Sequence, residues 1–284
     1  MIYAITLGSS QLGRQAIDHL LEKDLPADGL AALVRNAAKA QDLIDRGVEV
    51  RFAEYGDDNS MLWALEGVNG LYMISGMAPP EERIRQHRGV IEAAVKARVS
   101  HVVYASFIDT AEDSPFFAWK VNRDTETFLK ESGLPYTILR NGMYSEADLD
   151  HIDEYVKAGK VANNVGDGRI SYISRRDLAL AAVHCLLDHS HVDRTYTLTG
   201  PEALTQADLA RLISGWTGKE IPYEALSDEE YRATFPDPQW AGVIVTLYQS
   251  ARQGNMEAVT GDFQRITGRK AYTLAETYER FYKK

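Results

Sequence analysis

Short, almost wholly apolar segments alternate with longer amphipathic ones through the first half of the chain. The apolar segments are rich in β-branched and aromatic residues and lie at residues 2–6, 30–34, 48–52, 71–75, 102–106 and 136–139. Runs of this length and composition are typical of strands that are covered on both faces.

Apolar side chains recur at helical spacing between these segments. Leu12, Ala16 and Leu20 form one such stripe, and similar stripes lie within residues 84–95 and 121–129. Strands that are regularly separated by helices form βαβ units. The pattern therefore predicts an α/β fold with a doubly wound parallel Rossmann sheet.

The rhythm changes after Arg140. Helical patterns dominate the second half, at residues 144–158, 175–188, 205–217, 227–253 and 273–282, with short extended pieces at 170–173 and 196–198. No Pro-, Gly- or Ser-rich linker separates the halves. We therefore expect a dinucleotide-binding domain over residues 1–140 and a smaller, mostly helical substrate-binding cap over 141–284, with short strands that could rejoin the main sheet.

Charge and cysteine content narrow the choice of partners. The net charge of −10 argues against binding to nucleic acid or to anionic membranes. Cys185 is the only cysteine, which excludes an internal disulfide, and no apolar run approaches the roughly 18 residues of a membrane span. These features predict a cytoplasmic protein that acts on a small molecule, and we expect it to be a monomer or homodimer.

The turn after the first apolar segment lies where a dinucleotide fingerprint belongs, between a strand and a helix. Gly13 takes the glycine position for helix–strand packing, and Gly8 is available for the turn. Ser10 replaces the middle glycine, so its Cβ would crowd the phosphates or its hydroxyl would donate to them. The spacing also matches a P-loop, but Arg14 stands where that motif needs lysine.

The end of the second apolar segment bears on the choice of cofactor. An acidic residue there would bind the ribose 2′-hydroxyl of NAD, but this chain has Arg35, with Lys39 one turn further on. A guanidinium suits a 2′-phosphate. The sequence therefore favours NADP(H), although both residues could equally be solvated at the start of a helix.

Six short motifs together resemble the NmrA-like atypical short-chain dehydrogenases, in the branch that contains bacterial NADPH:quinone oxidoreductase and triphenylmethane reductase. They are Gln11-Leu12-Gly13, Val34-Arg35-Asn36-x-x-Lys39-Ala40, Ala53-Glu54-Tyr55-Gly56-Asp57, Ile74-Ser75-Gly76, Leu139-Arg140-Asn141-Gly142-x-Tyr144 and Gly166-Asp167-Gly168. The resemblance runs nearly end to end.

The resemblance implies a set of site residues. With Arg35, the turn residues would hold the adenosine phosphates: Gly8, Ser9, Ser10, Gln11 and Leu12. Ser75 and Gly76 would lie under the nicotinamide ribose. The segment from Tyr104 through Ser106 to Phe107 would pass beside the nicotinamide. The acceptor pocket would be lined by Phe107, Asn141, Met143 and Tyr144.

Two positions depart from the family pattern. The family's Thr-Gly-Ala-Thr-Gly is here Thr6-Leu7-Gly8-Ser9-Ser10, and a basic residue or histidine usual on the fifth helix aligns with Asn122.

No tyrosine has a lysine four residues later, so the proton relay of ordinary short-chain dehydrogenases is absent. That relay protonates a strongly basic alkoxide, whereas a quinone that accepts hydride becomes a phenolate, whose acid has a pKa of only about 10. The sequence therefore favours an electron-poor acceptor. Tyr104, Asn122 and Asn141 are the candidates for a catalytic role.

The sequence is compatible with three functions. The first is an NADPH-dependent oxidoreductase that acts on a quinone-like or conjugated aromatic acceptor. The second is a redox sensor that binds NADP(H) without turnover, and the third is a Rossmann protein that has lost its cofactor. No metal site is expected, because His189 and His191 have no evident third ligand.

Overall fold

The parallel sheet predicted from the first half of the chain is present in the computed structural model, which describes residues 1–283. Within these residues the main sheet has seven strands in the order β3-β2-β1-β4-β5-β6-β9, all parallel. The strands are β1 (Ile2–Thr6), β2 (Leu30–Val34), β3 (Glu49–Phe52), β4 (Val68–Ile74), β5 (His101–Phe107), β6 (Tyr136–Asn141) and β9 (Arg194–Leu198). The strand order reverses between β1 and β4, and such a switch point is where a dinucleotide binds in this fold.

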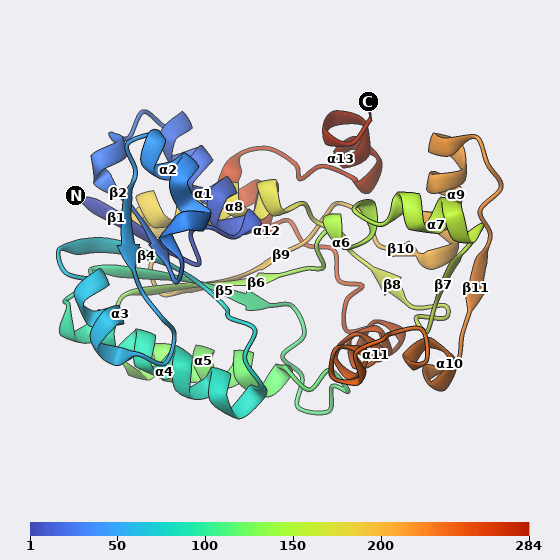
Figure 1. Cartoon of the computed structure of the whole chain (residues 1–284), viewed down its shortest axis with the longest axis horizontal. Coiled ribbons are helices and arrows are strands. Elements are labelled where there is room, and N and C mark those ends of the chain that lie inside the picture. Colours follow the sequence, from blue (N-terminus) through green and yellow to red (C-terminus); the bar gives the residue numbers. More distant parts are fainter. Residues whose placement is uncertain (284) are drawn as a thin grey trace.

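Helices cover both faces of the sheet (Figure 1). One layer is formed by α1 (Gln11–Glu22), α8 (Arg175–Leu187) and α12 (Asp262–Thr267), with α2 (Gln41–Asp45) beside it. The other layer is formed by α3 (Asp58–Ala64), α4 (Pro80–Lys96) and α5 (Trp119–Glu131). The Rossmann architecture is therefore confirmed.

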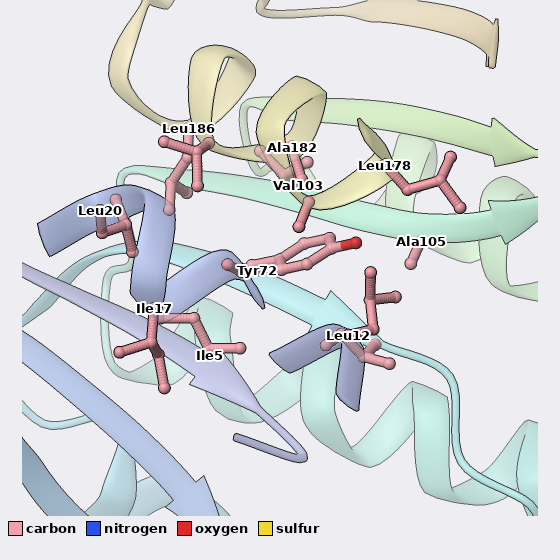
Figure 2. Packing of buried hydrophobic residues seen from close by; sticks show 14 of the residues in the cluster. Ile5, Leu12, Ile17, Leu20, Tyr72, Val103, Ala105, Leu178, Ala182 and Leu186 are labelled. Carbon is pink, nitrogen blue, oxygen red and sulfur yellow. The ribbon is translucent and has the colours of Figure 1, made fainter. Parts of the chain in front are cut away.

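Strand β4 shows how the alternation of side chains fills both layers. Leu71 and Met73 lie in the core beneath α3, α4 and α5, whereas Tyr72 and Ile74 lie in the core beneath α1 and α8. Figure 2 shows the Tyr72 ring between these two helices, with Leu12 on the α1 side and Leu178 on the α8 side. This packing on both faces fixes the positions of the strand ends.

The remaining elements form the cap on the right of Figure 1. Its helices are α6 (Glu146–Leu149), α7 (Ile152–Ala158), α9 (Gln206–Thr217), α10 (Asp228–Arg232), α11 (Pro238–Arg252) and α13 (Leu274–Phe281). Two small sheets pair β7 (Val161–Asn163) with β11 (Tyr223–Ala225) and β8 (Arg169–Ile170) with β10 (Leu204–Thr205). These elements share a hydrophobic core of their own.

The helical pattern predicted at residues 227–253 corresponds to two helices in the structure, α10 and α11. Pro236 and Pro238 interrupt the segment. Proline lacks a backbone N–H and disfavours helical geometry in the residue before it. Pro238 instead begins α11, and the Asp237 carboxylate accepts the backbone N–H groups of the first turn.

The chain returns to the main sheet after entering the cap. Strand β9 pairs with β6, α8 packs against α1, and α12 packs against α8. A division of the chain at residue 140 stays a prediction, and these three elements beyond it belong to the sheet layers. No helix within residues 1–283 is long and apolar enough to cross a membrane.

Candidate functional site

The carboxyl ends of β1, β2, β3 and β4 open onto a cavity of about 660 Å³. Four residues expected to bind the cofactor line it, namely Ser9, Arg35, Lys39 and Gly76. The cavity lies beside the switch point between β1 and β4, so the fold brings these residues together where a dinucleotide is expected.

Glycines make the turn between β1 and α1 fit closely against the sheet. A Cβ on Gly13 would lie 2.6 Å from the Leu7 carbonyl oxygen, and a Cβ on Gly8 would lie 2.8 Å from the Ala32 Cβ. Gly13 therefore allows the helix–strand packing expected of it. The left-handed residue of the turn is Leu7 (φ 49°), so Gly8 serves close approach to β2 and does not supply the unusual backbone angle.

Ser10 caps α1. Its Oγ accepts the backbone N–H of Gly13 at 3.1 Å, and its backbone is extended (φ −72°, ψ 162°), a conformation that needs no glycine. The N–H groups of Gln11 and Leu12 follow in the first turn, where helical amides have no intrahelical acceptor. This close-fitting turn and the exposed dipole of α1 suit the phosphates of a dinucleotide.

Arg14 is a feature of the site that the sequence analysis missed. Its Nε donates to the Ser9 carbonyl at 3.1 Å, its Nη2 donates to the Lys39 carbonyl, and its Nη1 pairs with Asp42. The side chain therefore joins the turn after β1 to the segment after β2. The only sequence signal was an arginine in place of the P-loop lysine.

Glu54 is a second residue whose position the sequence analysis did not foresee. It follows β3, and its Oε2 lies 3.7 Å from Nε of Arg35. Both side chains line the cavity together with Lys39. No acidic residue ends β2, yet the neighbouring strand brings a carboxylate to the same place.

The Ser75 hydroxyl contacts a buried histidine. His87 of α4 has Nδ1 2.8 Å from the Thr125 hydroxyl and Nε2 3.3 Å from the Ser75 hydroxyl. Because Thr125 donates to the Val121 carbonyl, it accepts from Nδ1–H, and Ser75 donates to Nε2. Burial and the nearby Arg83 lower the pKa of His87 to about 3, so the ring is neutral and orients Ser75.

Tyr104 and Asn122 are brought together, but inside the protein. The Tyr104 hydroxyl donates to Asn122 Oδ1 at 3.2 Å, and both side chains are buried. Burial raises the pKa of Tyr104 above its usual value. Neither residue lines the 660 Å³ cavity.

Ser106 is also engaged within the protein. Its hydroxyl donates to Glu126 Oε1 at 2.7 Å, and Glu126 accepts two hydrogen bonds from the Arg140 guanidinium. This network joins β5 and β6 to α5.

Asn141 and Phe107 meet at the edge of the sheet where the cap begins. They are paired in the register of β5 and β6. Asn141 is buried, and its Oδ1 has no hydrogen-bond partner within residues 1–283. Phe107 packs edge-on against Phe116, with ring centroids 5.4 Å apart. A buried amide without a partner for its oxygen, in register with an aromatic residue, suits a partly polar, aromatic ligand.

Met143 and Tyr144 continue from this edge into the cap. The Met143 carbonyl accepts the backbone N–H of Ile173 at 2.9 Å, and Tyr144 forms a β-bridge with the same residue. The Arg175 guanidinium lies 4.9 Å from the centre of the Tyr144 ring. Residues 173–175 therefore hold this segment in place.

The chain is similar over most of its length to proteins of known activity. Residues 8–189 match a family described as NAD(P)H-binding. Quinone oxidoreductase 2 of Escherichia coli is 35% identical over 279 residues, 96% of each chain.

Solved structures give the same relationship. An NADPH-dependent quinone oxidoreductase from Escherichia coli, solved with NADPH, is 33% identical and superposes with a TM-score of 0.92 over 99% of this chain and 100% of the other. Triphenylmethane reductase from Citrobacter, solved with NADP(H), is 29% identical with a TM-score of 0.92 over 98% and 99% of the two chains. The chain belongs to the NAD(P)H-binding family, within its NmrA-like branch, and is an NAD(P)H-dependent oxidoreductase.

Proposed function

We propose that this protein is an NADPH-dependent reductase of quinone-like or conjugated aromatic acceptors. The observation that carries the proposal is the buried Asn141, whose Oδ1 has no partner within residues 1–283, paired in register with Phe107 at the carboxyl ends of β6 and β5, in the same sheet as the cofactor cavity. The two relatives described above, named for quinone and triphenylmethane reduction, support this class of acceptor.

The cofactor preference rests on charge. Arg35 and Lys39 line the cavity at the end of β2, and their cationic groups suit the 2′-phosphate of NADPH. The amides at the start of α1 and the close-fitting Gly8 turn suit the pyrophosphate. Ser75, whose hydroxyl lies 3.3 Å from Nε2 of His87, would hold the nicotinamide ribose.

NADPH supplies a hydride from C4 of its nicotinamide. The protein's part is to hold the acceptor in position: Phe107 and Phe116 offer aromatic faces, and the Asn141 side chain would donate a hydrogen bond from Nδ2 to the acceptor's oxygen. A reduced quinone oxygen is a weak base whose conjugate acid has a pKa of about 10, so it takes its proton from water. Tyr104 is buried with a raised pKa, and the reaction does not use it as an acid.

The test compares two variants in NADPH oxidation with a panel of quinones. Asn141→Ala should lower kcat/KM about 10- to 100-fold, a loss of about 1.4–2.7 kcal/mol in transition-state stabilisation. Tyr104→Phe should change it less than about threefold, because losing a true general acid costs about 10²–10⁴ in rate. NADPH binding is measured first in both variants.

Two results would overturn the proposal. A collapse of turnover in Tyr104→Phe with Asn141→Ala nearly intact would assign proton donation to Tyr104. Tight NADPH binding with no turnover on any quinone would show a redox sensor in place of an enzyme.

A further inference from the structure

We infer that Glu54 sets the balance between NADPH and NADH by competing with the 2′-phosphate for Arg35. The inference rests on the proposed cofactor site and adds to it a residue that opposes the phosphorylated cofactor. The starting observation is the 3.7 Å separation between Arg35 Nε and Glu54 Oε2 in a cavity that both side chains line.

The backbone fixes the position of Glu54. Strands β2 and β3 are neighbours, with Val34 paired to Phe52, so Arg35 and Glu54 leave adjacent strand ends. The Glu54 N–H donates to the Ser60 hydroxyl at 3.1 Å, and the next residue, Tyr55, donates through its hydroxyl to the Ile74 carbonyl at 2.7 Å. These bonds anchor the segment from which the Glu54 carboxylate reaches the cavity.

The charges give the two cofactors opposite responses to this carboxylate. A 2′-phosphate that approaches Arg35 must compete with Glu54 for the positive charge of the guanidinium and then lie near a group of like charge. A 2′-hydroxyl carries no charge and can donate a hydrogen bond to the carboxylate. Glu54 therefore weakens NADPH binding and strengthens NADH binding, while Arg35 and Lys39 act in the reverse sense.

The expected effect is moderate because the pair is partly solvated. The exposed fractions of the Arg35 and Glu54 side chains are 76% and 35%, and ion pairs in such surroundings are weak. Glu54→Gln should raise the ratio of the NADH to the NADPH dissociation constant about three- to tenfold, most of all at low ionic strength.

The experiment titrates the full-length protein with NADPH and NADH by calorimetry at low and high ionic strength. Glu49→Gln is the matched control: it removes the same charge at the other end of β3, where Glu49 pairs with Arg51. It should leave the ratio unchanged. In the background of Arg35→Ala, which itself should weaken NADPH and not NADH, the Glu54→Gln effect should shrink because the competition for the guanidinium is gone.

The other possible results of these titrations separate a failure of this inference from a failure of the proposed function. Equal weakening of both cofactors by Glu54→Gln would overturn the inference and assign Glu54 to the part of adenosine that they share. An unchanged ratio, with NADPH still bound, would overturn it while leaving the proposed function intact. Failure of the unaltered protein to bind either cofactor would overturn the proposed function and this inference together.

Discussion

Leu7 adopts a left-handed backbone conformation (φ 49°) directly after β1. For a residue with a Cβ this conformation costs about 1–2 kcal/mol. The Leu7 side chain packs against the core beneath α1 and also lines the cofactor cavity, so burial offsets part of the strain. The strained residue therefore lies at the proposed cofactor site.

A pair of substitutions separates strain from packing at Leu7. Both Leu7→Ala and Leu7→Gly remove the packing, but glycine also removes the Cβ that causes the strain. We expect Leu7→Gly to be more stable than Leu7→Ala by about 1 kcal/mol, measured by urea unfolding. At Leu21, inside α1, the order should reverse because glycine is the poorer helix former. If the glycine and alanine variants had the same order of stability at Leu7 and at Leu21, the backbone strain at Leu7 would be contradicted.

Helices α4 and α5 pack against each other and against the sheet, and their apolar interface contains a polar cluster around His87. His87 lies between the Tyr55 and Tyr104 rings, with centroids 6.2 and 5.9 Å away, and bonds Ser75 and Thr125. The layer is arranged around a neutral imidazole, so acid should weaken it.

The unfolding free energy should fall as the pH is lowered from 7 to 5. Unfolded His87 takes up a proton near its ordinary pKa of about 6.5, whereas burial keeps the folded group unprotonated down to a pKa of about 3. The unfolded state therefore binds more protons between these values, and His87 alone should account for a loss of roughly 2 kcal/mol by pH 5. Urea unfolding at the two pH values measures it.

His87→Gln should reduce this pH dependence, while the exposed His151→Gln should leave it unchanged. An identical slope in the His87 variant would show that other groups cause the acid sensitivity. His101, whose pKa burial lowers to about 4, is the next to test.

Elements whose pattern is local were predictable, and contacts between distant segments were not. The bounds of β1 and β2 match the predicted segments at 2–6 and 30–34, because strands buried on both faces are apolar throughout. Arg14 meets Lys39, and Glu54 meets Arg35, only through the packing of α1 and the pairing of β2 with β3. The spacing of residues along the chain does not predict contacts between segments that are distant in sequence.

At the scale of the whole molecule, a buried carboxylate joins the sheet to the cap. Asp109 lies just beyond β5 and accepts hydrogen bonds from the hydroxyls of Ser114 and Ser250, and Ser250 belongs to α11 of the cap. Both Asp109 and Ser250 are buried. The bond holds α11 near Phe107 and Phe116, which are the proposed walls of the acceptor pocket.

Ser250→Ala should loosen the cap. Removing one donor to a buried carboxylate costs about 1–3 kcal/mol of unfolding free energy, and the acceptor KM should rise while the NADPH dissociation constant stays the same. Steady-state kinetics and NADPH titration measure these quantities. Ser214→Ala, which removes hydrogen bonds made within the cap, is the control and should spare KM. A weaker affinity for NADPH in Ser250→Ala would contradict this division of roles.

The path of the chain between the sheet and the cap determines which fragments could fold independently. Strand β9, α8 and α12 return from beyond residue 140 to complete the sheet layers. A fragment of residues 1–140 would keep the cofactor-binding turn yet leave Tyr72 and Val103 open to water on the face that α8 covers (Figure 2). Such a fragment would tend to self-associate. The cofactor-binding turn therefore rests on a core that closes only when the chain beyond residue 140 is present, so the sheet and its covering helices fold as one unit.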